Sequence, residues 1–146
     1  MKKIRRARVM FVCLGNACRS PMAEAIAWKI GAGVIEASSA GLTALGHVEA
    51  MSKETLIRNG YSAEGLSSKQ VSSMELAAVD LVVNMSGRVS DAALDGAAEV
   101  EHWKVEDPYG ADAEVYQRIF EDIEKRVAQL ADRLRSGNRK RRHRGE

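Results

Sequence analysis

Four short apolar runs along the chain are predicted to be β-strands. The first, Val9 to Val12, is a continuous run of strand-forming residues, which is typical of a strand buried on both faces of a parallel sheet. The others are expected at residues 33–38, 80–85 and 99–105. Charged side chains interrupt the last run, so it is expected at an edge of the sheet, with His102 as an exposed imidazole and not as a catalytic group.

Between these runs, apolar residues repeat at helical spacing. Helices are expected at residues 22–30, where Gly31 ends the first helix, and at residues 50–58, before the left-handed stop Asn59-Gly60. The capping-box pattern of Ser72-Ser73-Met74-Glu75 predicts that a further helix starts there.

The longest amphipathic stretch begins after Asp112, which is expected to cap the last helix. Acid-first pairs four residues apart, Glu121 with Lys125 and Asp122 with Arg126, are expected on its solvated side. Its apolar stripe comprises Val115, Tyr116, Ile119, Phe120, Ile123, Val127, Leu130 and Leu134. Parallel strands joined by helices predict an α/β fold with one doubly wound sheet.

Composition narrows the class of protein. The chain has 146 residues and a net charge of +2, which suits one globular domain of ordinary composition. We expect neither a signal peptide nor a membrane span, because no apolar stretch has the required length and setting. The two cysteines lie five residues apart in one loop, which favours a reducing, cytoplasmic environment over a disulfide framework.

Basic residues gather at both ends of the chain. Residues 136–146 are polar and strongly basic and lack periodicity, so we expect a disordered tail after a folded domain at residues 1–135. The tail can be a solvated end or a contact for acidic partners, RNA or membrane lipids. No recognition module for a specific nucleic acid accompanies it.

The most informative stretch is the turn after Val12. Gly15-Asn16 tolerates positive φ, and Ser20-Pro21 suits an N-cap and the first helical position. A helix N-terminus presents backbone N–H groups and the positive end of the helix dipole, so this turn is a site for a phosphate-like anion. Arg19 adds a planar fork for two oxygens of that anion, and Cys13 lies beneath it, where a positive field favours the nucleophilic thiolate.

The segment Cys13-Leu14-Gly15-Asn16-Ala17-Cys18-Arg19-Ser20-Pro21 resembles the signature loop of the low-molecular-weight protein tyrosine phosphatases and of the arsenate reductases built on the same fold. The resemblance implies a four-stranded parallel sheet of order 2-1-3-4, flanked by helices on both faces, with this loop at the switch point. It implies that Cys13 is the nucleophile and that phosphate is bound by Leu14, Gly15, Asn16, Ala17, Cys18 and Arg19.

The same resemblance assigns supporting residues. Ser20 is expected to hydrogen-bond the nucleophilic sulfur and to ease its departure. In Ser39-Ala40-Gly41, Ser39 is expected to hydrogen-bond Asn16, although a serine there is also a common turn residue. Cys18 either packs within the loop or forms a reversible disulfide with Cys13 that protects the nucleophile from higher oxidation.

A second chemical element follows the last predicted strand, in Glu106-Asp107-Pro108-Tyr109-Gly110. Cleavage of a phosphate ester requires a proton for the departing oxygen, and proline biases the preceding residue toward an extended backbone. The match to the family's late Asp-Pro motif makes Asp107 the proposed general acid. Tyr109 either lines the substrate mouth, as the resemblance suggests, or packs on the last helix.

These residues predict a phosphomonoesterase, and more specifically a protein tyrosine phosphatase that forms a cysteinyl-phosphate and needs no metal or cofactor. It would act on a phosphotyrosine protein or a small aryl phosphate, bind phosphate, vanadate and arsenate, and occur as a monomer or weak dimer. The substrate is the least determined part. The loop Leu42–His47 lacks the aromatic residue of eukaryotic-type members, and Gly110 stands where they carry a second tyrosine.

Two other functions stay open. The first is arsenate reduction, because arsenate is a near copy of phosphate. Its thioredoxin-coupled form needs cysteines outside the loop, which this chain lacks, whereas a form resolved by an external small thiol needs only Cys13. The stretch Met51–Lys69 resembles that reductase branch. The second is a non-catalytic phosphate-binding module.

Overall fold

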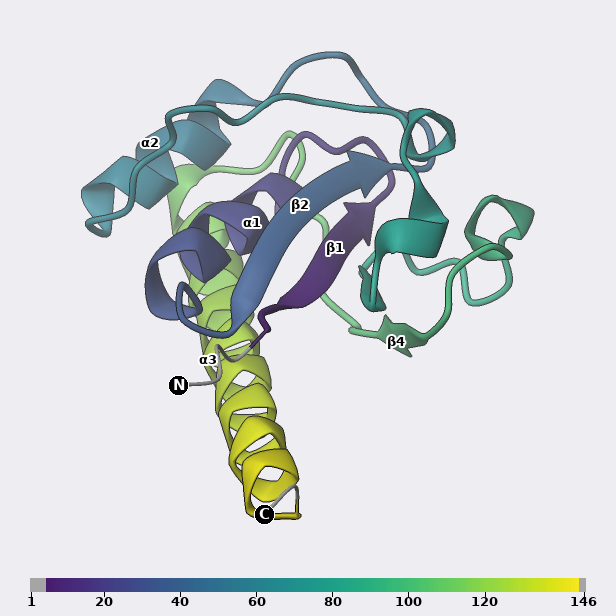
Figure 1. The fold of residues 1–146 in the computed structure, drawn as a ribbon. Coiled ribbons are helices and arrows are strands. Elements are labelled where there is room, and N and C mark those ends of the chain that lie inside the picture. The colour runs from purple at the N-terminus through teal and green to yellow at the C-terminus, as the bar shows by residue number, and fades with distance from the viewer. Residues whose placement is uncertain (1–4, 145–146) are drawn as a thin grey trace.

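Four parallel strands form one sheet in the order β2-β1-β3-β4, as the family resemblance implied (Figure 1). Every neighbouring pair is parallel, so the predicted fold class is confirmed. The computed structural model describes residues 5–144, and side chains as far as residue 137. The strands are β1 (Ala7–Cys13), β2 (Ile35–Gly41), β3 (Leu81–Asn84) and β4 (Val100–His102).

The central strand β1 is buried on both faces, which explains its unbroken apolar sequence. Val9, Phe11 and Cys13 belong to one core cluster, and Met10 and Val12 belong to the cluster on the opposite face. None of the five is more than 2% exposed. Successive side chains of a strand point to opposite faces, so this sequence can only serve a sheet that is covered on both sides.

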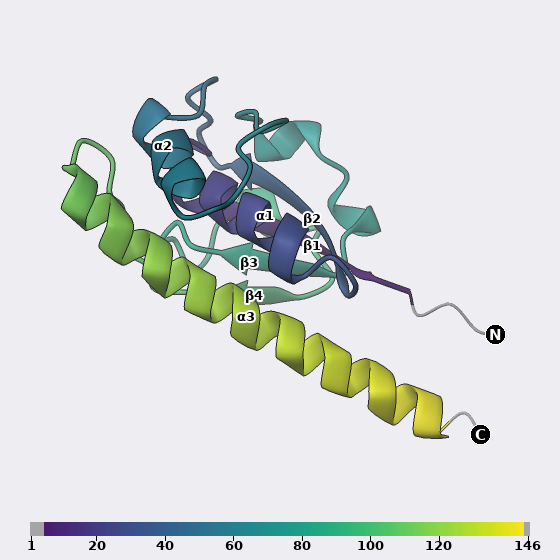
Figure 2. The same ribbon diagram turned by 90° about the vertical axis from the view of Figure 1, so that its left-hand side faces the viewer.

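Helices α1 (Arg19–Ile30) and α3 (Ala113–Arg144) lie on one face of the sheet, and α2 (Ala50–Arg58) packs against both of them (Figure 2). The apolar stripe predicted for the last helix is confirmed, because most of its members join the larger core cluster. Asp112 caps α3 by accepting a hydrogen bond from Val115 N at 3.1 Å. Of the two expected pairs, Asp122 and Arg126 are in contact at 2.9 Å, whereas Glu121 accepts from Gln117.

On the opposite face, where the resemblance also implied helices, the described residues form short 3₁₀ turns and no α-helix: η1 (Val71–Ser73), η2 (Leu76–Ala78) and η3 (Ala92–Leu94). The helix predicted from the capping box at residues 72–75 is therefore wrong. Glu75 precedes η2 without any side-chain capping bond. The chain must enter β3 directly afterwards, where Asp80 accepts a hydrogen bond from Arg8 N, so one turn is all that fits.

Helix α1 starts two residues earlier than Ser20-Pro21 predicted. Its N-cap is Cys18, which makes no side-chain capping bond. The Ser20 hydroxyl instead lies against Cys13 and Asn16. A side chain that is used by the anion-binding turn is not available to cap the helix, so the N-cap prediction for Ser20 is wrong for a functional reason.

The tail that was expected to be disordered from residue 136 is drawn as part of α3, which continues to Arg144. Arginine and lysine are good helix formers, and a single glycine, here Gly137, costs a helix only about 1 kcal/mol. The side chains of residues 138–146, and residues 1–4 with Lys2 and Lys3, lie outside the described part. The boundary between domain and tail at residue 135 stays a prediction. In the described chain, no helix combines the length and hydropathy needed to cross a bilayer.

Candidate active site

The predicted anion loop joins the carboxyl end of β1 to the start of α1, and Asn16 fixes its shape. Asn16 has φ 49°, the one positive value among described residues other than glycine. Its side-chain amide donates to Ser20 Oγ at 2.8 Å and to Ser39 Oγ at 3.0 Å. Its carbonyl oxygen accepts from Lys69 N at 2.7 Å. The expected contact between Ser39 and Asn16 is therefore present, and it holds a strained backbone in place.

The loop presents unpaired hydrogen-bond donors. Within the described chain, the backbone N–H groups of residues 14–18 donate to no protein acceptor. Arg19 Nε is buried and has no partner among the described groups. Buried donors without partners are rare in folded proteins, so this set indicates a site for an anion.

Arg19 is held from behind by two backbone carbonyls. Its Nη1 donates to Met85 O and, at 3.2 Å, to Val105 O. These oxygens follow the carboxyl ends of β3 and β4. The Arg19 side chain is only 7% exposed, and the anchoring of its Nη1 leaves Nε and Nη2 for a ligand. Because these two acceptors are backbone oxygens, no pattern of side chains in the sequence indicates them, and they were not predicted.

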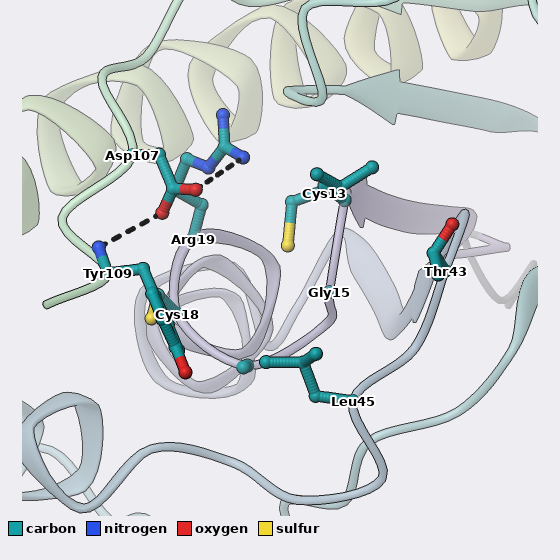
Figure 3. A pocket seen from close by; sticks show the side chains of 10 residues that line it. Cys13, Gly15, Cys18, Arg19, Thr43, Leu45, Asp107 and Tyr109 are labelled. Carbon is teal, nitrogen blue, oxygen red and sulfur yellow. Dashed lines mark hydrogen bonds and ion pairs between the residues drawn. The ribbon is translucent and has the colours of Figure 1, made fainter.

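Cys13 lies at the base of the pocket with its sulfur directed into it (Figure 3). Its Sγ is 2.9 Å from Ser20 Oγ. That hydroxyl oxygen already accepts a hydrogen bond from Asn16, which leaves the hydroxyl hydrogen free to be donated to the sulfur. The hydroxyl is therefore placed to stabilise a thiolate at Cys13.

Cys18 differs from Cys13 in its surroundings. It is buried, and burial raises the pKa of its thiol. Its Sγ contacts Tyr116 OH on α3 at 3.2 Å, and burial raises the pKa of that phenol as well. Both groups are therefore neutral near neutral pH, so the Cys18 thiol packs against Tyr116 as an uncharged group. Both cysteines are free thiols, and a regulatory disulfide between them stays a prediction.

Asp107 reaches the mouth of the same pocket from the segment after β4 (Figure 3). Its carboxylate lies 3.4 Å from Arg19 Nη2 and is 45% exposed. Its other oxygen accepts from Tyr109 N at 3.1 Å, which fixes the turn at the proline. A carboxyl held beside the anion loop and open to solvent has the position of a proton donor for a leaving group.

The pocket has a volume of about 300 Å³. Leu45 and Tyr109 stand at its rim and are 47% and 59% exposed, so Tyr109 lines the mouth and is not packed on α3. Asn16 is absent from the lining, because its side chain braces the loop from behind. The lining comprises Cys13, Leu14, Gly15, Ala17, Cys18, Arg19, Thr43, Leu45, Asp107 and Tyr109. No group of three or more His, Cys, Asp or Glu among the described residues is arranged to hold a metal.

Glu24 is a further member of this network that sequence reasoning missed. It is 6% exposed and accepts a hydrogen bond from Ser39 Oγ at 2.5 Å. Burial raises the pKa of its carboxyl. The sequence could have indicated this role, because a single glutamate within the apolar stretch Met22–Ala27 is expected to be buried and must then have a hydrogen-bond partner.

Comparison with known proteins places the chain in a family. Residues 8–140 match the family described as low molecular weight phosphotyrosine protein phosphatase. The chain is 30% identical to a glutaredoxin arsenate reductase of Synechocystis sp., over 87% of this chain and 98% of that protein. It is 42% identical to the low molecular weight protein-tyrosine-phosphatase YfkJ of Bacillus subtilis, over 53% of this chain and 54% of that protein. A solved arsenate reductase in the phosphate binding state superimposes with a TM-score of 0.80 and 29% identity, covering 88% and 98% of the two chains. The chain belongs to the low-molecular-weight phosphotyrosine protein phosphatase family, which includes enzymes named for both activities.

Proposed function

We propose that this protein is a phosphomonoesterase that hydrolyses aryl phosphates, phosphotyrosine among them, through a cysteinyl-phosphate at Cys13. The observation that carries the proposal is the placement of Asp107 beside Arg19 at the mouth of a pocket whose base is the Cys13 sulfur. A phosphate monoester bound in the pocket would then be surrounded by the anion loop, the nucleophile Cys13 and the proton donor Asp107.

The first step is attack of the Cys13 thiolate on phosphorus. The free N–H groups of residues 14–18, with Arg19 Nε and Nη2, hold the phosphoryl oxygens as charge develops on them. The bond from phosphorus to the leaving oxygen breaks while Asp107, in its protonated form, gives that oxygen a proton. The products are an alcohol or phenol, a cysteinyl-phosphate and an Asp107 carboxylate.

The second step is hydrolysis of the cysteinyl-phosphate. The Asp107 carboxylate takes a proton from water as the water oxygen attacks phosphorus. The bond from sulfur to phosphorus breaks, and the Ser20 hydroxyl stabilises the departing thiolate from 2.9 Å. Inorganic phosphate leaves, and the thiolate and the protonated Asp107 are restored for the next cycle.

Hydrolysis of an aryl phosphate by the reduced protein at mildly acidic pH tests the proposal, with and without vanadate. We expect turnover that vanadate inhibits and that Cys13→Ser abolishes, while phosphate binding survives. Appreciable turnover by Cys13→Ser would refute the mechanism. Asp107→Asn should slow alkyl phosphates more than aryl phosphates with good leaving groups, and equal losses on both would argue against its role as the acid.

The second candidate is arsenate reduction with an external small thiol, which the names of several relatives favour. Cys13 would attack arsenate and displace one of its oxygens as water, forming a sulfur–arsenic bond. The external thiol would then attack the Cys13 sulfur, and the electron pair of the breaking sulfur–arsenic bond would stay on arsenic, which leaves as arsenite while Cys13 remains in a mixed disulfide. The chain's only other cysteine is Cys18 in the same loop, so no intramolecular relay to an outer cysteine is available. Arsenite formation with excess glutathione, in the absence of aryl phosphatase activity, would place this candidate first.

A further inference from the structure

The wall of the pocket formed by Thr43 and Leu45 belongs to the segment that follows β2, here called the wall segment, residues 42–46. It runs alongside the anion loop through three backbone hydrogen bonds. Leu42 N donates to Cys13 O at 3.1 Å, Thr43 N to Leu14 O at 2.8 Å, and Leu45 N to Gly15 O at 2.9 Å. The side chain of Leu45 then covers Gly15, where it faces the pocket together with Thr43 (Figure 3).

Two side chains hold the outer edge of the wall segment: Ser68 Oγ accepts from Gly46 N at 3.1 Å at its end, and Gln70 holds its middle, beside Thr43. The Gln70 Nε2 donates to Leu42 O at 2.6 Å, and Gln70 Oε1 accepts from Ala44 N at 2.8 Å. The amide therefore bonds the residues on both sides of Thr43, as a neighbouring strand would. A planar amide that uses both its donor and its acceptor on one backbone segment fixes the position and the orientation of that segment.

Gln70 is itself anchored firmly. Its neighbour Lys69 accepts from Gly41 N at 2.8 Å and donates its own N–H to Asn16 Oδ1, which ties the segment to the end of β2 and to the anion loop. The next residue, Val71, is 1% exposed in the core beneath the sheet. Because its two neighbours are fixed in this way, Gln70 can hold the wall segment at the rim of the pocket in one position.

From this geometry we infer that Gln70 is a positioning residue that determines specificity for the organic group of the substrate. This inference rests on the proposed function. Gln70 is not among the residues that line the pocket around Cys13, so it acts through Thr43 and Leu45, which would flank the leaving group. Inorganic anions are held by the anion loop alone, so their binding should not depend on Gln70.

A binding experiment separates these two contributions. Calorimetric titration of the reduced protein with phenylphosphonate and with inorganic phosphate gives the ratio of the two dissociation constants. Gln70→Ala removes both hydrogen bonds, and we expect the preference for phenylphosphonate to fall about 3- to 10-fold while phosphate affinity stays within about twofold. Gln70→Met, which keeps the length of the side chain, should give the same shift.

Two further variants make the test specific. Ser73→Ala is the matched control, because it removes an exposed hydrogen bond to Gln70 O at 2.7 Å and leaves the Gln70 amide intact; the preference should stay at the wild-type value. Leu45→Ala removes the wall directly, and Gln70→Ala added to it should then change the preference by less than about twofold, because coupled residues are not additive.

Wild-type protein without any preference for phenylphosphonate overturns the inference, as does a preference that Gln70→Ala leaves unchanged. Equal losses for both ligands would show that Gln70 supports the anion loop and not the wall segment, which also overturns it. These titrations measure binding and not turnover, so they test the role of Gln70 separately from the proposed reaction. A protein that bound these ligands as expected but hydrolysed no aryl phosphate would refute the proposed function alone.

Discussion

Gly41→Ala tests how closely the end of β2 approaches the anion loop. A Cβ at this position would lie 2.9 Å from Asn16 N, 2.9 Å from Leu14 O and 3.0 Å from Asn16 Cβ. Carbon atoms normally come no closer than about 3.5 Å to such neighbours, so roughly 0.5 Å of movement is required. Gly41 N is bonded to Lys69 O, and β2 is paired to β1 along its whole length, so the loop is the part that must move.

The expected cost follows from that displacement. Overpacking of this kind costs about 1–3 kcal/mol of stability, which is roughly 3 to 10 °C in melting temperature for a domain of this size. A shift of the loop also misplaces the amides that hold the phosphoryl group. Because a misplacement of about 1 Å can cost 100-fold in rate, we expect kcat/KM for an aryl phosphate to fall about 10- to 100-fold.

Gly33→Ala is the matched control for this prediction. A Cβ at Gly33 would meet nothing within 4 Å, so we expect unchanged activity and a stability that is equal or slightly higher. Thermal unfolding, phosphate titration and aryl phosphate kinetics on the three proteins complete the test. A Gly41→Ala protein that melts lower but binds phosphate and turns over within twofold of wild type would refute the reasoning, because β2 and not the loop would then have yielded.

Two other predictions concern groups bonded to the loop. Ser20→Ala removes the hydroxyl 2.9 Å from Cys13 Sγ, and since hydrogen bonds to charged groups contribute about 1.5–3 kcal/mol, we expect kcat to fall about 10- to 150-fold. Rapid-mixing kinetics should show a burst of phenol before slow turnover, and a burst-free, wild-type rate would contradict the role in sulfur departure. Glu24→Gln keeps an acceptor for Ser39 but cannot ionise. Burial raises the pKa of Glu24 in the folded state above its pKa in the unfolded chain. The contribution of Glu24 to the free energy of unfolding is therefore full below the unfolded-state pKa and is lost as the pH rises through the folded-state pKa. The stability of Glu24→Gln relative to wild type should therefore increase from pH 4 to pH 7.5 in urea unfolding, and a pH-independent difference would count against the shift.

The sequence was sufficient for the parts of the site whose chemistry is local. An apolar strand, a turn that allows positive φ and a helix start are adjacent in the chain, so the anion loop with Cys13 and Arg19 could be predicted from residues 9–21. Asp107 is remote, and its prediction depended on the family resemblance together with the rule that parallel strands end at one edge of the sheet.

What could not be predicted depends on tertiary contacts of backbone groups. The carbonyls of Met85 and Val105 anchor Arg19 only because β3 and β4 end beside the loop, and any residue type could supply them. The polar stretch before Val71 has no periodicity, so its hydrogen bonds to the anion loop and the wall segment left no pattern. Ser20 was assigned a helix cap because local rules cannot know that a sulfur and an asparagine compete for its hydroxyl.

The anion loop does not by itself separate a phosphatase from an arsenate reductase, because both oxyanions have the same shape and charge. The difference lies in how the covalent adduct on Cys13 is resolved. Hydrolysis ends with water at phosphorus and leaves every oxidation state unchanged, and the proposed mechanism assigns its proton transfers to Asp107 and the stabilisation of the departing sulfur to Ser20. Reduction takes two electrons from a pair of thiols and needs a second sulfur. The only other cysteine, Cys18, is buried against Tyr116 with a pKa raised by burial. On the proposed mechanism, hydrolysis would need only water and this chain's own residues, whereas reduction would need a thiol from outside, and that asymmetry is our physical reason for proposing hydrolysis first.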